Sequence, residues 1–202
     1  MTPRVLRVDP ERPCLTRIDA AAAVLRAGGL AAFPTETFYG LGAATHCQDA
    51  LARIFRAKGR PEAKPLLVLV SSVAMAERVA EVPPEARELM ARYWPGALTL
   101  VLRARPGVSA VITGGTGTIG VRHSPHRIPS VLVERLGEPI TAPSANRSGE
   151  PPLTTAGEVL GVFEGEIDVV LDGGPTPGGL PSTVLDLTVF PPLVRRAGAV
   201  AL

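Results

Sequence analysis

The stretch RIFRAKGRPEAKPLLVLV, residues 53–70, gives the clearest indication of the fold. It ends in the apolar run LLVLV, residues 66–70, in which hydrophobic and polar residues do not alternate. A strand covered on one face alternates, so this run predicts a strand that is buried on both faces of a sheet. Five basic residues occupy the twelve positions 53–64 before it, which places positive charge at the entrance to a buried strand.

Short aliphatic runs alternate with helical patterns along the rest of the chain, which is typical of an α/β fold. Helices are expected at residues 17–27, 48–57, 84–94, 128–137 and 156–163. Strands are expected at residues 29–35, 66–70, 97–102, 118–122, 139–142, 168–172, 183–187 and 192–196. No internal repeat interrupts this order, so the pattern predicts one sheet-based unit.

The composition predicts a single globular domain over residues 1–202, because 46% of the residues are hydrophobic and 20% are charged. A net charge of +2 is small for a protein that neutralises nucleic-acid phosphates along a whole face. Cys14 and Cys47 lack the spacing of a zinc site or a disulfide framework, and we interpret both as reduced thiols. The N-terminus lacks the apolar segment of a signal peptide, so we expect a cytoplasmic protein.

Two polar loops follow predicted strands. In FPTETFYG, residues 33–40, a strand ends at Phe33, and hydroxyl, carboxylate and phenol groups follow it. In APSANRSG, residues 142–149, Pro143 ends a strand, and two serines, an asparagine and an arginine follow. Ligands of open α/β sheets bind outside strand ends, so we expect the two loops to face each other across a crevice. An ordinary polar turn is the alternative interpretation of the first loop.

Cationic side chains are predicted at the same edge. Lys58 and Lys64 are the only lysines of the chain, and Arg60 lies between them. Lysine is a compact, mobile charge suited to phosphate, whereas a solvated run of charge is the alternative interpretation. Arg122 and Arg196 each end a predicted strand, where a bidentate fork can hold a carboxylate or a phosphate. These residues together predict a site for a polyanion, such as a nucleotide triphosphate, beside a smaller carboxylate ligand.

Two other patterns are weaker. GTGTIG, residues 115–120, has the spelling of a dinucleotide fingerprint, but the prolines that follow argue against the helix that such a site needs. His123 and His126 have a three-residue spacing, but Pro125 argues against a shared helical face for a metal.

Six motifs taken together resemble the YrdC family of threonylcarbamoyl-AMP synthases. In order, they are PTETFYGLG, KGRPEAKPL, WPGALTLVL, TIGVR, APSANRSG and LPSTVLDL. The resemblance implies an open, twisted mixed sheet with flanking helices and a positively charged concave groove. It implies ATP-dependent synthesis of threonylcarbamoyl-AMP from L-threonine and bicarbonate or CO2, with release of pyrophosphate. Mg2+ is expected to accompany ATP.

The resemblance also implies the site residues and the partners. On the ATP side the matching residues are Lys58, Arg60, Thr118, Ser144, Asn146 and Arg196, of which Lys58, Arg60, Ser144 and Asn146 would be catalytic. On the threonine side they are Thr35, Lys64, Arg122, Ala142 through its backbone, and Ser182. No protein ligand for a metal is implied. The product would serve downstream transferase proteins that modify adenosine 37 of tRNAs reading codons that begin with A; direct binding of tRNA to this chain is expected to be weak.

Some details of the sequence bear on this resemblance. It ends six residues after Arg196, which resembles the short form of the family without an extra C-terminal domain. Lys64 stands where the family often has Asn or His. We expect Lys58 and Arg60 to be exposed, so that replacing them leaves the fold intact.

One alternative function is that of a non-catalytic RNA-binding or ribosome-maturation factor that uses the same groove. Another is a carbamoyl transfer domain like that of hydrogenase maturation proteins, which should bring further segments that this sequence lacks.

Overall fold

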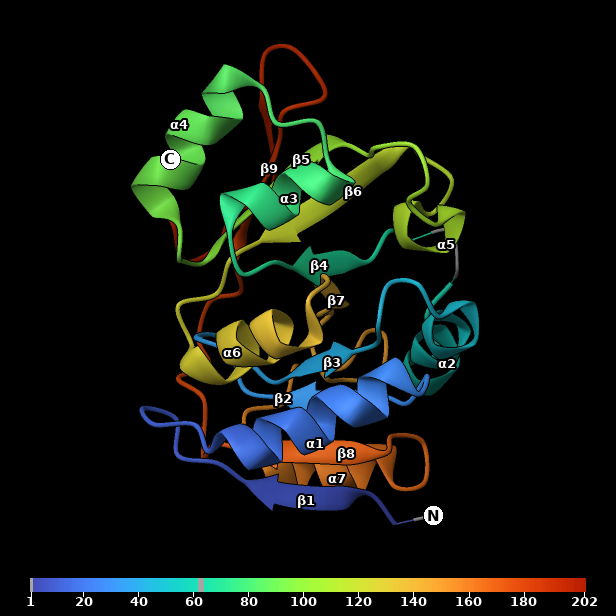
Figure 1. Cartoon of the computed structure of the whole chain (residues 1–202). Coiled ribbons are helices and arrows are strands. Elements are labelled where there is room, and N and C mark those ends of the chain that lie inside the picture. The colour runs from blue at the N-terminus through green and yellow to red at the C-terminus, as the bar shows by residue number, and fades with distance from the viewer. Residues whose placement is uncertain (1, 62–63) are drawn as a thin grey trace.

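A computed structural model describes residues 2–61 and 64–202 and arranges their helices and strands in two stacked parts (Figure 1). The helices in these ranges are α1 (Leu15–Arg26), α2 (Gln48–Lys58), α3 (Val73–Val79), α4 (Pro84–Tyr93), α5 (Ala110–Thr113), α6 (Arg127–Leu136) and α7 (Ala156–Phe163). The strands are β1 (Arg4–Arg7), β2 (Ala31–Phe33), β3 (Gly40–Gly42), β4 (Leu67–Leu69), β5 (Leu98–Arg103), β6 (Thr118–Arg122), β7 (Ile140–Thr141), β8 (Val169–Asp172), β9 (Thr183–Asp186) and β10 (Leu193–Arg196).

The strands form two open sheets. The lower sheet of Figure 1 has the order β1-β8-β2-β3, and the upper sheet has the order β10-β9-β5-β6-β4-β7. Both contain parallel and antiparallel pairs. The sheets meet where an antiparallel bridge joins Ala44 to Ile140 and where Thr141 Oγ1 accepts a hydrogen bond from Ala43 N at 2.9 Å. The predicted open α/β architecture is confirmed, with its strands divided between two sheets rather than gathered in one.

The apolar run LLVLV, residues 66–70, folds as predicted. It forms β4, between β6 and β7 of the upper sheet. Leu66, Val68, Leu69 and Val70 are all buried, whereas Leu67 is half-buried. Side chains that point to opposite faces are therefore covered, which is the arrangement that a run without alternation indicates.

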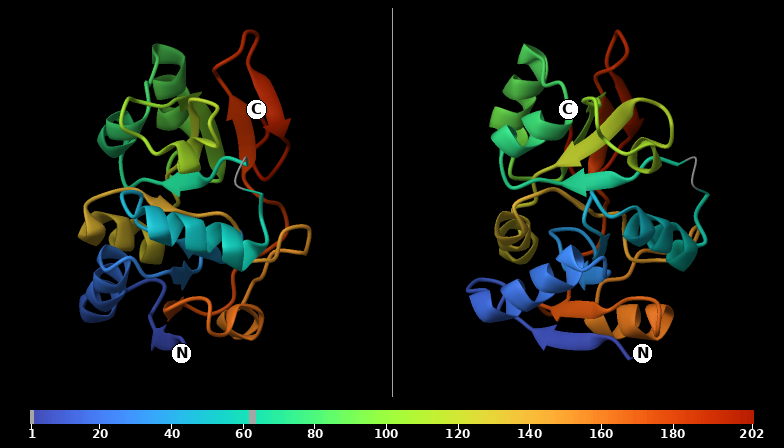
Figure 2. Two further views of the ribbon diagram at one scale, coloured as in Figure 1. Left: turned by 90° about the vertical axis from the view of Figure 1, so that its right-hand side faces the viewer. Right: turned by 45° about the vertical axis from the view of Figure 1, so that its right-hand side comes forward.

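Small side chains on α1 allow its neighbours to pack closely against it. The buried stripe of α1 consists of Ile18, Ala21, Ala22 and Leu25, each fully inaccessible, and α1 packs against α6. The side views show α2 crossing the molecule at the level where the two sheets meet (Figure 2). This position carries the C-terminal end of α2 towards the loops that follow β2 and β7.

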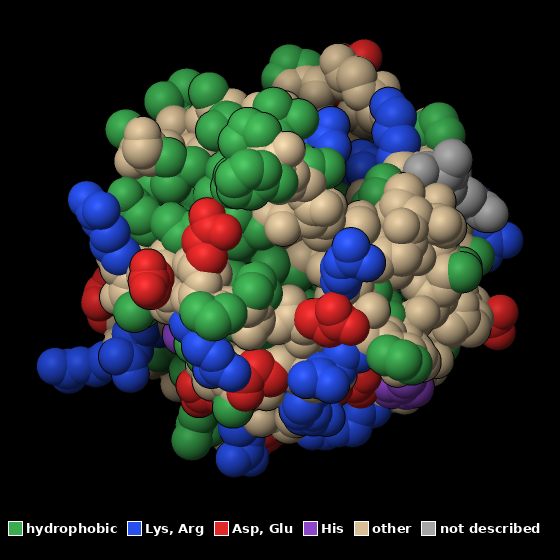
Figure 3. Space-filling model, turned by 90° about the horizontal axis from the view of Figure 1, so that it is seen from above, with side chains coloured by type: hydrophobic (Ala, Val, Ile, Leu, Met, Phe, Trp, Pro, Cys, Tyr) green, Lys and Arg blue, Asp and Glu red, His purple; other side chains and the backbone are tan. Residues whose placement is uncertain are grey.

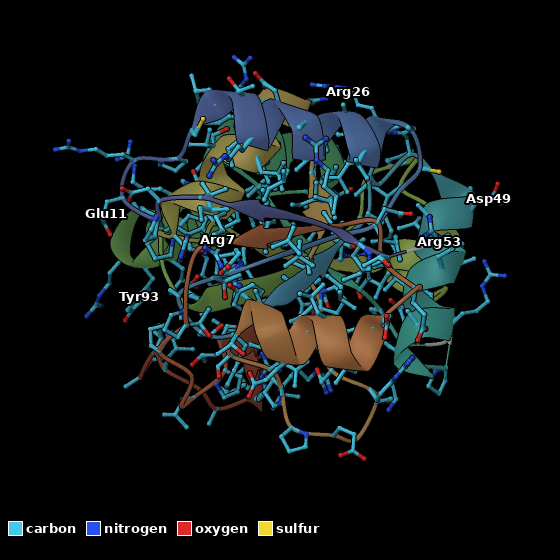
Figure 4. All side chains as sticks on the ribbon, turned by 90° about the horizontal axis from the view of Figure 1, so that it is seen from below. Arg7, Glu11, Arg26, Asp49, Arg53 and Tyr93 are labelled. Atoms are coloured by element: carbon cyan, nitrogen blue, oxygen red, sulfur yellow. The ribbon has the colours of Figure 1, made fainter. Side chains whose placement is uncertain are left out.

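One basic residue of the opening stretch has a structural contact. Arg53 lies on α2 near the lower sheet (Figure 4), where its Nη2 donates to Asp168 Oδ2 at 2.9 Å and its Nη1 donates to Gly28 O at 3.3 Å. It therefore ties α2 to the residues that immediately precede β2 and β8. The positive charge of this stretch is thus only partly directed at a ligand.

Four elements, β1, β3, α3 and α5, are absent from the sequence-based expectations. Glycine is depleted in strands, so GLG at β3 gives no strand signal. In the structure the two glycines make room for the Phe33 ring, because a Cβ at Gly42 would lie 2.7 Å from Phe33 Cε1. The edge strand β1 buries only Leu6, and α3 and α5 are short, so their apolar patterns are weak.

Candidate active site

A cleft of about 620 Å³ lies between the upper sheet and the loops that follow β2 and β7. This volume is typical of small-molecule sites. The polar side chains along it are those of Thr35, Thr37, Tyr39, Arg60, Thr99, Thr118, Arg122, Ser144, Ser182 and Arg196. Among the described lining residues there are three arginines and no carboxylate, so the cleft is suited to anionic ligands.

Strand β6 places alternate residues in the cleft. Thr118, Gly120 and Arg122 line it, whereas the intervening Ile119 and Val121 are buried in the core. This division follows from the two-residue period of a strand. The motif TIGVR therefore places the hydroxyl of Thr118, the backbone of Gly120 and the guanidinium of Arg122 on one surface.

The two polar loops lie side by side and bond to each other directly, instead of facing each other across a crevice as expected. Leu41 N donates to Pro143 O at 2.9 Å, and Ala145 N donates to Tyr39 O at 2.7 Å. Thr35 is buried, and its hydroxyl donates to Phe38 O at 2.7 Å, which fixes the turn inside the first loop. Each loop is therefore held in its conformation by the other and by its own backbone contacts.

The Ala142 backbone lies at the junction of the second loop with the sheet. Its N–H donates to Leu67 O at 2.8 Å, and both residues line the cleft. A backbone group of the loop is thereby fixed against β4 beside the predicted threonine side.

Arg122 is the most buried cation of the cleft, with an exposed fraction of 4%. Its guanidinium forms no hydrogen bond with the described residues, and its Nε is buried without a partner. Among the described residues its ion-pair partner is Glu36, whose Oε1 lies 3.7 Å from Arg122 Nη1. Burial lowers the pKa of Arg122, while the Glu36 carboxylate acts in the opposite direction. A buried guanidinium with unused donors is a receptor for a planar anion such as a carboxylate.

A second arginine is fixed beside it through Ser182. Arg196 donates from Nε to Ser182 O and from Nη2 to Ser182 Oγ, both at 3.0 Å. Partial burial and, next, the charge of Arg122 lower the pKa of Arg196. Thr99 Oγ1 lies 2.9 Å from Ser182 Oγ, so this hydroxyl is held from two sides. Sequence reasoning missed Thr99, and the available signal was a polar residue inside the apolar run of β5.

Lys58 is buried, with an exposed fraction of 2%, so the expectation that it is exposed was wrong. Its Nζ donates to Ser144 O, to Asn146 O at 2.7 Å and to Asn146 Oδ1 at 3.3 Å. Ser144 Oγ donates to Asn146 Oδ1 at 2.6 Å. Desolvation and, next, the charge of Arg60 lower the pKa of Lys58 to about 8. Lys58 and Asn146 therefore lie immediately behind Ser144, which lines the cleft.

The rest of the basic segment is divided. Arg60 is half-buried, lines the cleft and donates from Nη2 to Pro65 O at 2.9 Å; burial lowers its pKa. Lys64 is exposed and is not among the described lining residues. The intervening positions 62 and 63 of the KGRPEAKPL motif lie outside the described residues. Eight of the predicted site residues line the cleft: Thr35, Arg60, Thr118, Arg122, Ala142, Ser144, Ser182 and Arg196. Lys58 and Asn146 lie behind Ser144 and do not line it, and Lys64 is not part of the group.

The weaker sequence patterns lie in structural contexts that differ from those of the sites they resemble. GTGTIG leads into strand β6 instead of a helix. Within residues 2–61 and 64–202 no group of three or more His, Cys, Asp and Glu side chains could hold a metal ion. Cys14 and Cys47 are free thiols. None of the helices in the described part of the chain has the length and hydropathy needed to span a membrane.

Comparison with known proteins points to one family. The sequence pattern named Sua5_yciO_yrdC, described as "Telomere recombination", matches residues 23–198. The chain is 48% identical over 187 residues to a threonylcarbamoyl-AMP synthase of Pyrococcus abyssi, which covers 92% of this chain and 55% of the relative. It is 43% identical over 186 residues to the Bacillus subtilis protein of that name, with coverages of 91% and 54%.

Comparison with solved structures points to the same family. The crystal structure of P. abyssi Sua5 complexed with L-threonine superimposes with a TM-score of 0.92 at 47% identity, covering 96% of this chain and 57% of that one. The chain therefore spans about half the length of these relatives.

Proposed function

The chain belongs to the Sua5/YciO/YrdC family, and from this premise we propose that its cleft makes threonylcarbamoyl-AMP from L-threonine, bicarbonate or CO2, and ATP. Pyrophosphate is the second product. The observation that carries this proposal is the buried Arg122 guanidinium with unused donors beside a cleft lined by further arginines. It supplies a carboxylate receptor next to cations suited to a triphosphate.

The threonine side is formed around Arg122. Its guanidinium receives the carboxylate of threonine, and the hydroxyls of Thr35 and Ser182 line the same cleft. A hydroxyl can both donate and accept, so it suits an amino acid that carries a hydroxyl of its own. Lys64 lies outside this arrangement, and we assign it no contact with threonine.

The ATP side is formed by Arg60, Thr118, Ser144 and Arg196, with Lys58 and Asn146 behind them. The threonine amine, after losing a proton, attacks CO2 to form a carbamate. A carbamate oxygen then attacks the α-phosphorus of ATP, and the bond to pyrophosphate breaks. The cations disperse charge on the phosphates and on the leaving group, and the cleft holds an unstable carbamate near its target. No covalent enzyme intermediate is required.

Mg2+ is proposed to enter with ATP. Magnesium sites of this kind use one or two carboxylates together with substrate phosphates and water. No carboxylate is among the cleft residues that the structure describes, so the phosphates and water would supply the ligands. The protein residues would then position the triphosphate rather than the ion.

The product is proposed to leave the cleft for downstream transferase proteins that modify adenosine 37 of tRNA in the cytoplasm. A role as an RNA-binding factor is less favoured. On the upper end of the molecule, acidic side chains lie among the basic ones and a large area is hydrophobic (Figure 3). Proteins that hold RNA by charge present a continuous basic surface instead.

The test is release of pyrophosphate by the purified chain. We expect release from ATP only when threonine and bicarbonate are both present. The control omits each substrate in turn and replaces threonine with valine, which has a similar shape and no hydroxyl. Equal release without threonine would exclude this assignment, and tight RNA binding without turnover would favour the RNA-binding role.

A further inference from the structure

A half-buried acid lies directly behind the proposed carboxylate receptor. Glu36 belongs to the loop after β2, and its Oε1 is 3.7 Å from Arg122 Nη1. Glu36 is not among the described residues that line the cleft, whereas Arg122 is. The acid therefore acts on a ligand through the guanidinium and through its electric field.

The position of Glu36 is fixed from its other side. Ser124 Oγ donates to Glu36 Oε2, and it accepts a hydrogen bond from His126 N at 3.2 Å. Ser124 is itself buried, with an exposed fraction of 3%. One carboxylate oxygen is thus held by a buried hydroxyl, while the other is directed at Arg122.

Each member of the ion pair retains an unpartnered polar atom. Glu36 Oε1 and Arg122 Nε are both buried without a hydrogen bond to the described residues. At 3.7 Å the pair is longer than a direct hydrogen bond, so it compensates charge without using the donors of the guanidinium. Buried unsatisfied atoms in a native protein call for an explanation, and here they accompany a receptor for a ligand.

We propose that Glu36 is a positioning residue that makes the Arg122 site select an α-amino acid over a simple carboxylate. This inference rests on the proposed function. A carboxylate bound to Arg122 approaches the negative charge of Glu36, which opposes binding. The ammonium group of an amino acid brings a positive charge into the same field and offsets that cost. A ligand with both charges is therefore favoured over one that carries only the negative charge.

The other charges near the pair are the same in the wild type and in a Glu36 variant, so the variant isolates the contribution of Glu36. The charge of Arg122 lowers the pKa of nearby Arg196, and the Arg196 guanidinium attracts the carboxylate of either ligand while it repels the ammonium group of threonine. Burial lowers the pKa values of His123 and His126, which disfavours a positive charge on either ring. Among the described residues Glu36 is the acid that pairs with Arg122, and its charge is the one that the test removes.

The experiment compares binding of L-threonine with binding of (R)-3-hydroxybutanoate, which lacks only the amino group, by calorimetry. In Glu36→Gln we expect threonine to bind about tenfold more weakly while the analogue binds equally well or better. Ser124→Ala, which leaves Glu36 in place but unsupported, should shift the selectivity in the same direction by a smaller factor. Glu138→Gln is the matched control, because this acid pairs with His46 away from the cleft.

The outcomes separate the two proposals. If the wild-type chain does not bind threonine, the proposed function fails. If it binds threonine but Glu36→Gln weakens both ligands equally, Glu36 is merely structural and the inference is overturned. The thermal midpoint of each variant is measured alongside, and Ser124→Ala provides the comparison if Glu36→Gln does not fold.

Discussion

The ammonium group of Lys58 is bound twice by Asn146, at 2.7 Å to its carbonyl oxygen and at 3.3 Å to its side-chain Oδ1. Its third hydrogen bond goes to Ser144 O, and Ser148 N donates back to Lys58 O at 2.7 Å. The end of α2 and the loop after β7 are thus joined in both directions. An ammonium has three donors, so Lys58 first positions this loop, and it must release one partner to contact a phosphate.

Lys58→Ala is expected to destabilise the fold as well as to remove activity. The substitution leaves the oxygens of Ser144 and Asn146 without their donor, and unsatisfied buried groups cost about 1–3 kcal/mol each. We expect the free energy of unfolding in urea to fall by about 2–3 kcal/mol. Lys64→Ala removes the other lysine from an exposed position and should change it by less than about 0.5 kcal/mol. Equal stability of the two variants would show that the contacts of Lys58 are not structural.

Affinity for ATP is expected to decrease as the pH rises above about 8. The pKa of Lys58 in the free protein is about 8, because desolvation disfavours its charge. Bound phosphates favour the charged form and raise that pKa, so the complex keeps a proton that the free protein has lost. The terminal phosphate of ATP is already ionised below this range. Calorimetry from pH 7 to pH 9.5 measures this decrease in ATP affinity. The Lys64→Ala variant should show the same pH dependence as the wild type. Constant affinity across the range would mean that Lys58 does not contribute charge to the nucleotide site.

Arg122→Lys is expected to weaken threonine binding while leaving ATP binding nearly unchanged. Lysine keeps the positive charge opposite Glu36 but cannot form two parallel hydrogen bonds with a carboxylate. We expect at least a tenfold loss of threonine affinity, or about 1.4 kcal/mol. Separate titrations with each ligand check the result. A parallel loss for both ligands would place Arg122 at the boundary between the two sides instead of on the threonine side.

The sequence predicts the part of the site that depends on local periodicity. In TIGVR the alternation of polar and apolar residues places Thr118 and Arg122 on one face of a strand, and β6 has this arrangement. The helix pattern around Leu51 and Ile54 likewise predicts α2 with nearly correct bounds. These features depend on neighbours within a few residues, so one sequence contains enough information.

The remaining features depend on contacts between distant segments. Lys58 lies in the last turn of α2, where a cation is usually exposed to solvent beside the helix carbonyls. Its burial is decided by the loop at Ser144, which is 86 residues away in the sequence. The proximity of Glu36 to Arg122 is determined in the same way, by the packing of the first loop against β6. No local pattern contains either relationship, and both were therefore missed.

Gly120→Val is expected to block the cleft with little effect on the fold. Gly120 lies between Thr118 and Arg122 on the face of β6 that lines the cleft, and an added Cβ would meet only Thr99 Cγ2 at 3.4 Å and Leu67 Cα at 3.9 Å. These are ordinary contacts, and valine favours strands, so we expect the unfolding midpoint to stay within a few degrees of the wild type. The branched side chain would extend into the cleft beside Arg122, and binding of ATP and threonine should fall together. Gly157→Val, in α7 and open to solvent, is the matched control for adding the same side chain. Full activity of Gly120→Val would mean that the ligands do not occupy the floor of this cleft, which would remove the basis of the assignments to both sides.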